Sequence, residues 1–300
     1  EYKPFFIPVK NIFRPVPLAV FLSSFLLFLV QPLISQALLP WFGGGIAVWA
    51  TAMVFFQTML LLGYAYAHLL TKTSTRNQLI IHALFIIAAL FFLPILPDAD
   101  LKPFAGQNPA WQMLLVLTLS IGLPYFLLSS TAPLLQAWQA RLSTQKSPYK
   151  LYAVSNAASL LALFAYPLVM QPLFALSWQS WIWTTLFLAF LLTLTGVART
   201  LLRQDATPQE PQPVSPRPRW FHLLRWVFLS FVGSAFSLAV TNQLTLDIAP
   251  TPFLWILPLA VYLLTFMLVF GDDIWYERNM MAGLYAFLLF GVLDTQASGE

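Results

Sequence analysis

The chain has 300 residues, of which 59% are hydrophobic and only 9% are charged. The 15 Lys and Arg residues outnumber the 11 Asp and Glu residues, and there is no Cys. The lack of Cys excludes a disulfide framework, a thiolate metal site and a thiol nucleophile. The few charges avoid the long apolar runs, a pattern typical of a protein that crosses a membrane several times.

Nine apolar stretches without Asp, Glu, Lys or Arg follow one another along the chain. They cover residues 16–39, 46–70, 79–96, 111–137, 151–172, 176–198, 226–246, 248–271 and 279–293. A bilayer core of about 30 Å needs about 20 apolar residues in a helix, and only the ninth stretch is clearly short. Inside lipid, runs of this length satisfy their backbone amides as helices. The sequence therefore predicts an all-α, polytopic membrane protein with about nine transmembrane helices.

The basic residues indicate the orientation. If the N-terminus is cytoplasmic and the spans alternate, 14 of the 15 Lys and Arg residues fall inside and only Lys102 falls outside. Cytoplasmic loops hold an excess of Lys and Arg, so we expect the N-terminus to be inside. The basic loops also favour contact with anionic lipid. No basic run with interleaved aromatic residues indicates nucleic-acid binding.

A Pro-rich segment divides the predicted spans into six and three. Residues 199–220 contain five prolines among Gln, Glu, Asp and Ser, a composition that cannot bury a core. The predicted organisation is a cytoplasmic N-terminal segment at 1–15, a six-helix bundle at 16–198, a cytoplasmic linker at 199–220, the start of a second bundle with helices seven to nine at 221–293, and a tail at 294–300. Because the chain begins with Glu1 and stops soon after the ninth stretch, we expect it to be part of a longer protein.

Six spans followed by a cytoplasmic linker is also the plan of the major facilitator transporters. This is an analogy at the level of the fold. The Gly- and Arg-rich loop that those transporters carry between their second and third spans is not found in residues 71–77.

Polar side chains within the spans are the candidates for a solute-binding site. Gln31 and Gln36 lie in the first span and Gln57 lies in the second. Two interpretations stay open for these amides: they line a polar path through the bundle, or they pair across one helix interface.

Asp247 is the only acidic residue close to predicted spans on both sides, and it follows Asn242 and Gln243. An ionisable group at that depth costs free energy unless it faces water or a partner, which makes it a functional candidate. The alternative is that Asp247 lies in an outer loop and caps the next helix.

A second polar cluster lies toward the inner leaflet. It comprises residues 129–131 in the fourth span and Tyr152, Ser155 and Asn156 in the fifth. Small polar residues there can hold helices together by hydrogen bonds, and Asn156 is also a candidate for solute binding.

The sequence contains no motif typical of a metal site or a catalytic site. His68, His82 and His222 are far apart and none has metal-ligand spacing. There is no nucleophile elbow, no Gly-rich cofactor turn and no convergent set of acids and bases. The sequence therefore predicts no metal, no cofactor and no catalytic residue within these 300 residues.

Several blocks of sequence point to one family. They are QPL at 31–33, LPWFGG at 39–44, TAPLLQ at 131–136, LYAVSNAASL at 151–160, TNQL at 241–244 and PFLWILPL at 252–259. In these blocks the chain resembles the membrane domain of the fused major-facilitator/spermidine-synthase proteins of bacteria. The resemblance extends over residues 16–293. It implies a bacterial cytoplasmic (inner) membrane location and a polyamine-related context.

In that family a cytosolic aminopropyltransferase-like domain follows the membrane domain, and nothing in this chain resembles that domain. Two functions are therefore expected. The bundle transports a small polar or cationic solute such as a polyamine, or it is a non-transporting anchor or scaffold for a cytosolic synthase-like domain of the same protein. Spans so poor in acids suit a polycation badly, because an ammonium group that leaves water must be paired.

Overall fold

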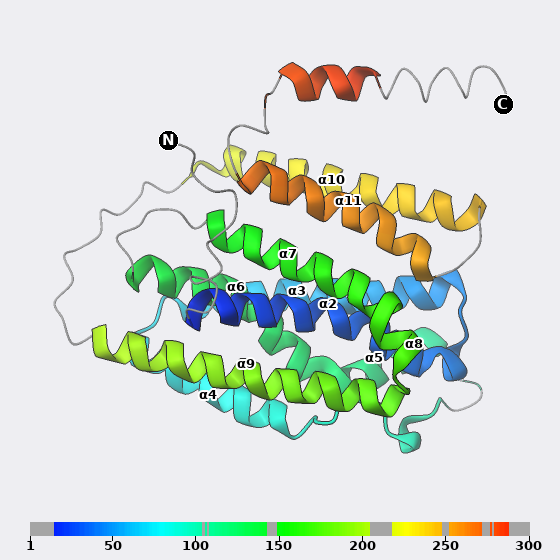
Figure 1. Ribbon diagram of the computed structural model, residues 1–300, viewed down its shortest axis with the longest axis horizontal. Helices are drawn as coiled ribbons and strands as arrows, with labels where there is room; N and C mark the ends of the chain where they lie inside the picture. Colours follow the sequence, from blue (N-terminus) through cyan, green and yellow to red (C-terminus); the bar gives the residue numbers. More distant parts are fainter. Residues whose placement is uncertain are drawn as a thin grey trace.

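The structure is a computed structural model. It describes residues 15–103, 106, 108–142, 149–204, 218–247, 252–271, 277 and 279–287. All regular secondary structure in these ranges is helical (Figure 1). Six helices are long and apolar enough to cross a membrane. The predicted class, an α-helical membrane protein, is confirmed.

The helices follow one another along the chain as a set of long antiparallel elements joined by short connections. They are α2 (Pro15–Phe42), α3 (Ile46–Leu70), α4 (Thr75–Leu90), η1 (Ala99–Leu101), α5 (Pro109–Leu117), η2 (Thr118–Gly122), α6 (Leu123–Leu142), α7 (Tyr149–Ala165), η3 (Tyr166–Met170), α8 (Gln171–Leu173), α9 (Leu176–Gln204), α10 (Trp220–Asp247) and α11 (Pro252–Gly271). Residues 279–287 are also helical. Because η2 and η3 are π-helical turns, α5–η2–α6 and α7–η3–α8 each form one continuous helix with a π-bulge.

The six membrane-length helices match the first, second, fourth, fifth, sixth and seventh predicted spans. The apolar helices at Thr75–Leu90 and Leu257–Val269 are shorter, and the ninth span is described only at 279–287. A total of nine spans and a major-facilitator architecture therefore stay predictions. Residues 1–14, 205–217 and 288–300, which include most of the predicted linker and the whole tail, lie outside the described residues.

The third span differs from the expectation of a helix over residues 79–96. The helix begins at Thr75, because the side chain of Ser74 accepts a hydrogen bond from the backbone N–H of Asn77 and caps the first turn. It ends at Leu90. Pro94 follows within one turn, and a proline inside a helix removes a hydrogen bond and collides with the preceding turn.

Helix α2 is the centre of the bundle. It packs against α6, α7 and α9, and residues from Val16 to Leu38 are buried along its length. Around it, α3 packs against α5 and α6, and α4 packs against α6 and α9. The main core is a cluster of aliphatic and aromatic side chains, most of them from α2, α3, α5, α6, α7 and α9, and a smaller cluster joins Leu163 of α7 to Ala260 and Leu263 of α11.

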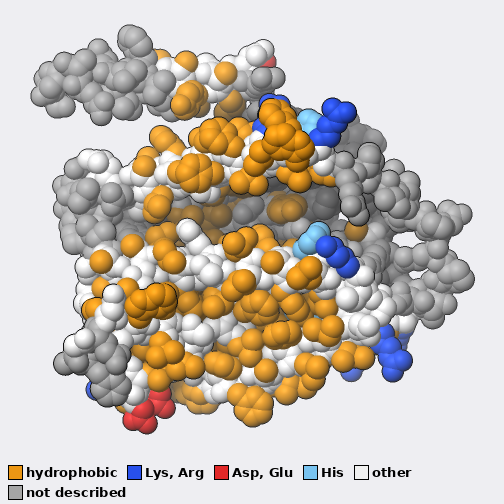
Figure 2. Space-filling view, turned by 180° about the vertical axis from the view of Figure 1, so that it is seen from behind, with side chains coloured by type: hydrophobic (Ala, Val, Ile, Leu, Met, Phe, Trp, Pro, Cys, Tyr) orange, Lys and Arg blue, Asp and Glu red, His pale blue; other side chains and the backbone are white. Residues whose placement is uncertain are grey.

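The pair α10 and α11 stands apart from this body. Helix α11 packs against α7, and α10 packs against α11. Figure 2 shows a hollow between this layer and the rest of the bundle. It also shows most of the Lys and Arg side chains at one end of the molecule and a group of acidic side chains at the other. This asymmetry is the one that the sequence predicts for the two sides of a membrane.

Gly63 marks a close approach between α3 and α6. A Cβ atom on Gly63 would lie 1.9 Å from the Oγ atom of Ser129 and 2.9 Å from the backbone nitrogen of Ser130. The hydroxyl of Ser129 lies 2.8 Å from the carbonyl oxygen of Phe126 in its own helix and 3.2 Å from that of Met59 in α3, and its one proton is shared between these acceptors. Small residues permit such contacts between membrane helices, which confirms the predicted helix-pairing role of Ser129.

Replacing Gly63 with Ala is expected to destabilise the protein by about 1–3 kcal/mol, the usual cost of overpacking, because the backbone of Ser130 cannot rotate away. Thermal unfolding in detergent measures the effect. Gly233→Ala is the matched control, since its Cβ would meet nothing nearer than the ring of Tyr262 at 3.9 Å. Equal melting temperatures for the two variants would contradict the close approach.

Candidate functional site

A hydrogen bond between α2 and α6 lies near the middle of α2 and of the continuous helix α5–η2–α6. The side-chain amide of Gln31 donates to the hydroxyl oxygen of Tyr125 over 3.2 Å and to the carbonyl oxygen of Leu27 over 3.3 Å. Tyr125 is buried, whereas Gln31 is half-buried. Because Tyr125 accepts this bond, its own hydroxyl proton can donate to a further group.

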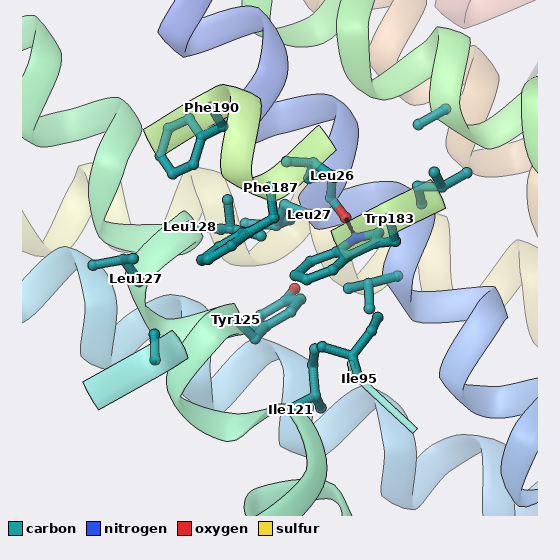
Figure 3. Close-up of a cluster of buried hydrophobic side chains, with 14 of the residues drawn as sticks. Leu26, Leu27, Ile95, Ile121, Tyr125, Leu127, Leu128, Trp183, Phe187 and Phe190 are labelled. Carbon is teal, nitrogen blue, oxygen red and sulfur yellow. Dashed lines mark hydrogen bonds between the residues drawn. The ribbon is translucent and has the colours of Figure 1, made fainter. Parts of the chain in front are cut away.

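Packing holds Tyr125 in place. Its ring lies 5.0 Å from the ring of Phe56 and 6.5 Å from that of Phe55, centroid to centroid. Figure 3 shows Tyr125 in one cluster with Trp183, whose indole N–H donates to the carbonyl oxygen of Leu26 over 3.0 Å. The π-bulge η2 ends three residues before Tyr125, and such bulges occur frequently at functional sites.

Two further tyrosines extend this polar region across α3 and α7. Tyr64 lies within electrostatic range of Tyr125 and of Tyr152. As whole residues, Tyr64 is 49% exposed and Tyr152 is 41% exposed. Polar side chains from four helices, α2, α3, α6 and α7, are thereby brought together although they are distant in sequence.

Two predicted amides share helix faces with these tyrosines. Gln57 precedes Tyr64 by two turns of α3 and is exposed; Asn156 follows Tyr152 by one turn of α7 and is half-buried. We call the set formed by Gln31, Gln57, Tyr64, Tyr125, Tyr152 and Asn156 the polar face. Its members Tyr64 and Tyr125 were missed at the level of sequence, because a Tyr in an apolar span carries no signal of which helix it meets.

Gln36 belongs to a separate contact. The hydroxyl of Tyr166, the first residue of η3, donates to the amide oxygen of Gln36. In the described structure Gln31 and Gln36 each bond to a tyrosine, of α6 and η3 respectively, and not to one another. The interpretation that these amides line a polar path stays a prediction. Gln57 is exposed and bonds to neither of them in the described structure.

The remaining predicted residues lie on α10. Asp247 is the last residue of this helix, so the expected outer loop begins after it and not at it. The side chains of Asp247 and Asn242 lie outside the described residues, and Gln243 is exposed. Their participation in a site stays a prediction.

Ser155, a member of the second polar cluster, joins two helices by a hydrogen bond with Ser24, as predicted for small polar residues there. Their hydroxyl oxygens lie 2.8 Å apart and join α2 to α7. A small cleft of about 10 Å³ lies at the other end of α2, where Ser35, Leu39 and Met113 contribute to its lining. Pockets for organic ligands are usually about 300–1,000 Å³, so this cleft is not the candidate site.

A second buried network was missed by the sequence reasoning. The indole N–H of Trp138 donates to the amide oxygen of Gln78 over 2.8 Å, and the amide nitrogen of Gln78 donates to the carbonyl oxygen of Thr73 over 2.8 Å. His82 lies one turn from Gln78, and its Nδ1 atom is 3.3 Å from the hydroxyl of Tyr66. The network joins α3, α4 and α6. Among the described residues no group of His, Asp and Glu could hold a metal ion.

Gln78→Leu is expected to lower the free energy of unfolding by about 1–3 kcal/mol, because it leaves the buried N–H of Trp138 and the carbonyl of Thr73 without partners. Thermal unfolding in detergent provides the measurement. Gln57→Leu, at an exposed Gln, should stay within about 0.5 kcal/mol of the original protein. A Gln78→Leu protein as stable as Gln57→Leu would show that the network contributes nothing.

Three comparisons with known proteins gave no match. No family model matches the chain, no curated protein matches it, and no solved structure matches it. The resemblance to the fused major-facilitator/spermidine-synthase proteins therefore rests on the sequence blocks alone and stays a prediction.

Proposed function

We propose that this chain is the membrane-embedded domain of a bacterial inner-membrane protein and that it moves a small polar solute across the bilayer, with the N-terminus in the cytoplasm. The observation that carries the proposal is the bond between Gln31 and Tyr125 near the middle of α2, together with the partly exposed residues Tyr64 and Tyr152. Solute sites of transporters commonly lie near the bilayer midplane.

The arrangement of the helices supports movement around this site. The polar face is carried by the body, and on the face drawn in Figure 2 a hollow opens between the body and the layer of α10 and α11, although α11 packs against α7. A π-bulge interrupts each of the continuous helices α5–η2–α6 and α7–η3–α8, and Pro32 lies inside α2 next to Gln31. Such local breaks in the helical ladder are tolerated in membranes only where protein or water satisfies the freed groups.

The solute itself is a second part of the proposal. The sequence resemblance suggests a polyamine, so putrescine and spermidine are the first probes. Phenol and amide groups bind through hydrogen bonds, and the faces of tyrosine rings also attract cations.

Uptake into proteoliposomes tests the site. Gln31→Leu and Tyr125→Phe are each expected to lower uptake of a transported probe by about ten-fold, which corresponds to one lost hydrogen bond of about 1.4 kcal/mol. Gln36→Leu and Tyr166→Phe are the matched controls, because they break the other pair of Gln and Tyr on α2. An equal loss in both pairs would mean that these bonds only hold helices together.

The alternative function is a membrane anchor or scaffold for a cytosolic aminopropyltransferase-like domain. It is favoured by the contacts between Ser24 and Ser155 and between Ser129 and Met59, whose hydrogen bonds serve helix packing. The two functions differ in one observable. A folded, reconstituted protein that transports no probe supports the anchor, whereas uptake that depends on Gln31 supports transport.

A further inference from the structure

The chemistry of the polar face narrows the kind of solute that it can hold. Its members are amides and phenols, which are uncharged donors and acceptors near neutral pH. Residues 15–90 and 109–204, which form the body of the bundle, contain no Asp or Glu. A cationic group that left water on this face would have no carboxylate from the body as a partner, and removal of an unpaired ion from water is strongly unfavourable.

The field at one end of the bundle acts in the same direction. Lys72 and Arg76 lie beyond the end of α3 that carries Tyr64, and Arg199 and Arg203 lie in the last turns of α9. Most of the basic side chains gather at one end of the molecule (Figure 2). Summed positive charge at that end of the bundle lowers the local concentration of a polycation.

An anion is disfavoured for the complementary reason. The basic residues stay in the end segments, and residues 15–71 and 103–140 contain no Lys or Arg. An anion attracted to the basic end of the bundle would therefore lose its Lys and Arg partners on reaching Gln31 and Tyr125. The tyrosine rings and the amides together suit a molecule with one apolar side and several hydrogen-bonding groups.

We propose that the polar face binds an uncharged, hydroxyl- or amide-rich solute and that it discriminates against polyamine cations. This inference rests on the proposed transport function and specifies its substrate class. Asp247, the last residue of α10, lies between two predicted spans, so it has its own place in the test.

The test is uptake by the reconstituted chain with five labelled probes: myo-inositol, glucose and uridine as uncharged solutes, spermidine as a cation and succinate as an anion. At least one uncharged probe is expected to enter ten-fold or more faster than spermidine and succinate. Tyr64→Leu should reduce that uptake ten-fold, and Asp247→Asn should leave it unchanged. The same uncharged probe should raise the melting temperature of the detergent-solubilised protein, and Tyr64→Leu should abolish the rise.

A charge placed on the polar face supplies the converse experiment. Gln57→Glu introduces a carboxylate at an exposed position of α3 and is expected to increase spermidine uptake, whereas Gln57→Leu is the control of similar size and should not. Preferential uptake of spermidine or succinate by the original protein would overturn this inference and leave transport in place. The absence of uptake and of a thermal shift with every probe would overturn the proposed function as well.

Discussion

Within a bilayer, a polar side chain has to find its hydrogen-bond partner inside the protein, and the organisation of this bundle follows from that constraint. Helix α2 is surrounded by α6, α7 and α9, so the polar atoms of Gln31, Gln36 and Ser24 are placed against neighbouring helices and not against lipid. Each has a partner on a different stretch of chain. These bonds specify the rotation of α2 relative to its neighbours, which apolar packing against lipid tails alone would leave poorly determined.

The same constraint separates two kinds of polar group. Gln78 and Trp138 are fully buried and bonded to each other, and such a closed network holds α4 against α6. Tyr64 and Tyr152 remain partly exposed beside the half-buried Gln31 and the buried Tyr125. At an exposed polar group beside a buried one, a solute can replace the existing hydrogen-bond partner without opening of the core. A solute site requires this property.

The charged residues that set the orientation in the membrane are separated along the helices from the polar residues of the candidate site. Basic residues lie at the ends of helices, where they report the side of the membrane, and the body between them is neutral over residues 109–140 and 151–198. The neutrality accounts for the stability of the spans in lipid and at the same time limits what they can bind. The sequence blocks suggest a polyamine substrate, which needs carboxylate partners, whereas the polar face is uncharged. The uptake of charged and uncharged probes decides between the two substrate classes.

By itself the sequence determined the helical membrane class, the approximate position of six long spans and the polar character of Gln31, Gln57 and Asn156, because uncharged runs of this length satisfy their backbone only as helices. The start of α4 at Thr75 depended on a local cap that the apolar pattern did not reveal. Only the tertiary structure decided that Gln31 meets Tyr125, that Gln36 meets Tyr166, and that Tyr64 and Tyr152 join the same region. The reason is physical: which side chains meet depends on the rotation and order of helices, and apolar faces that look alike in sequence do not encode either one.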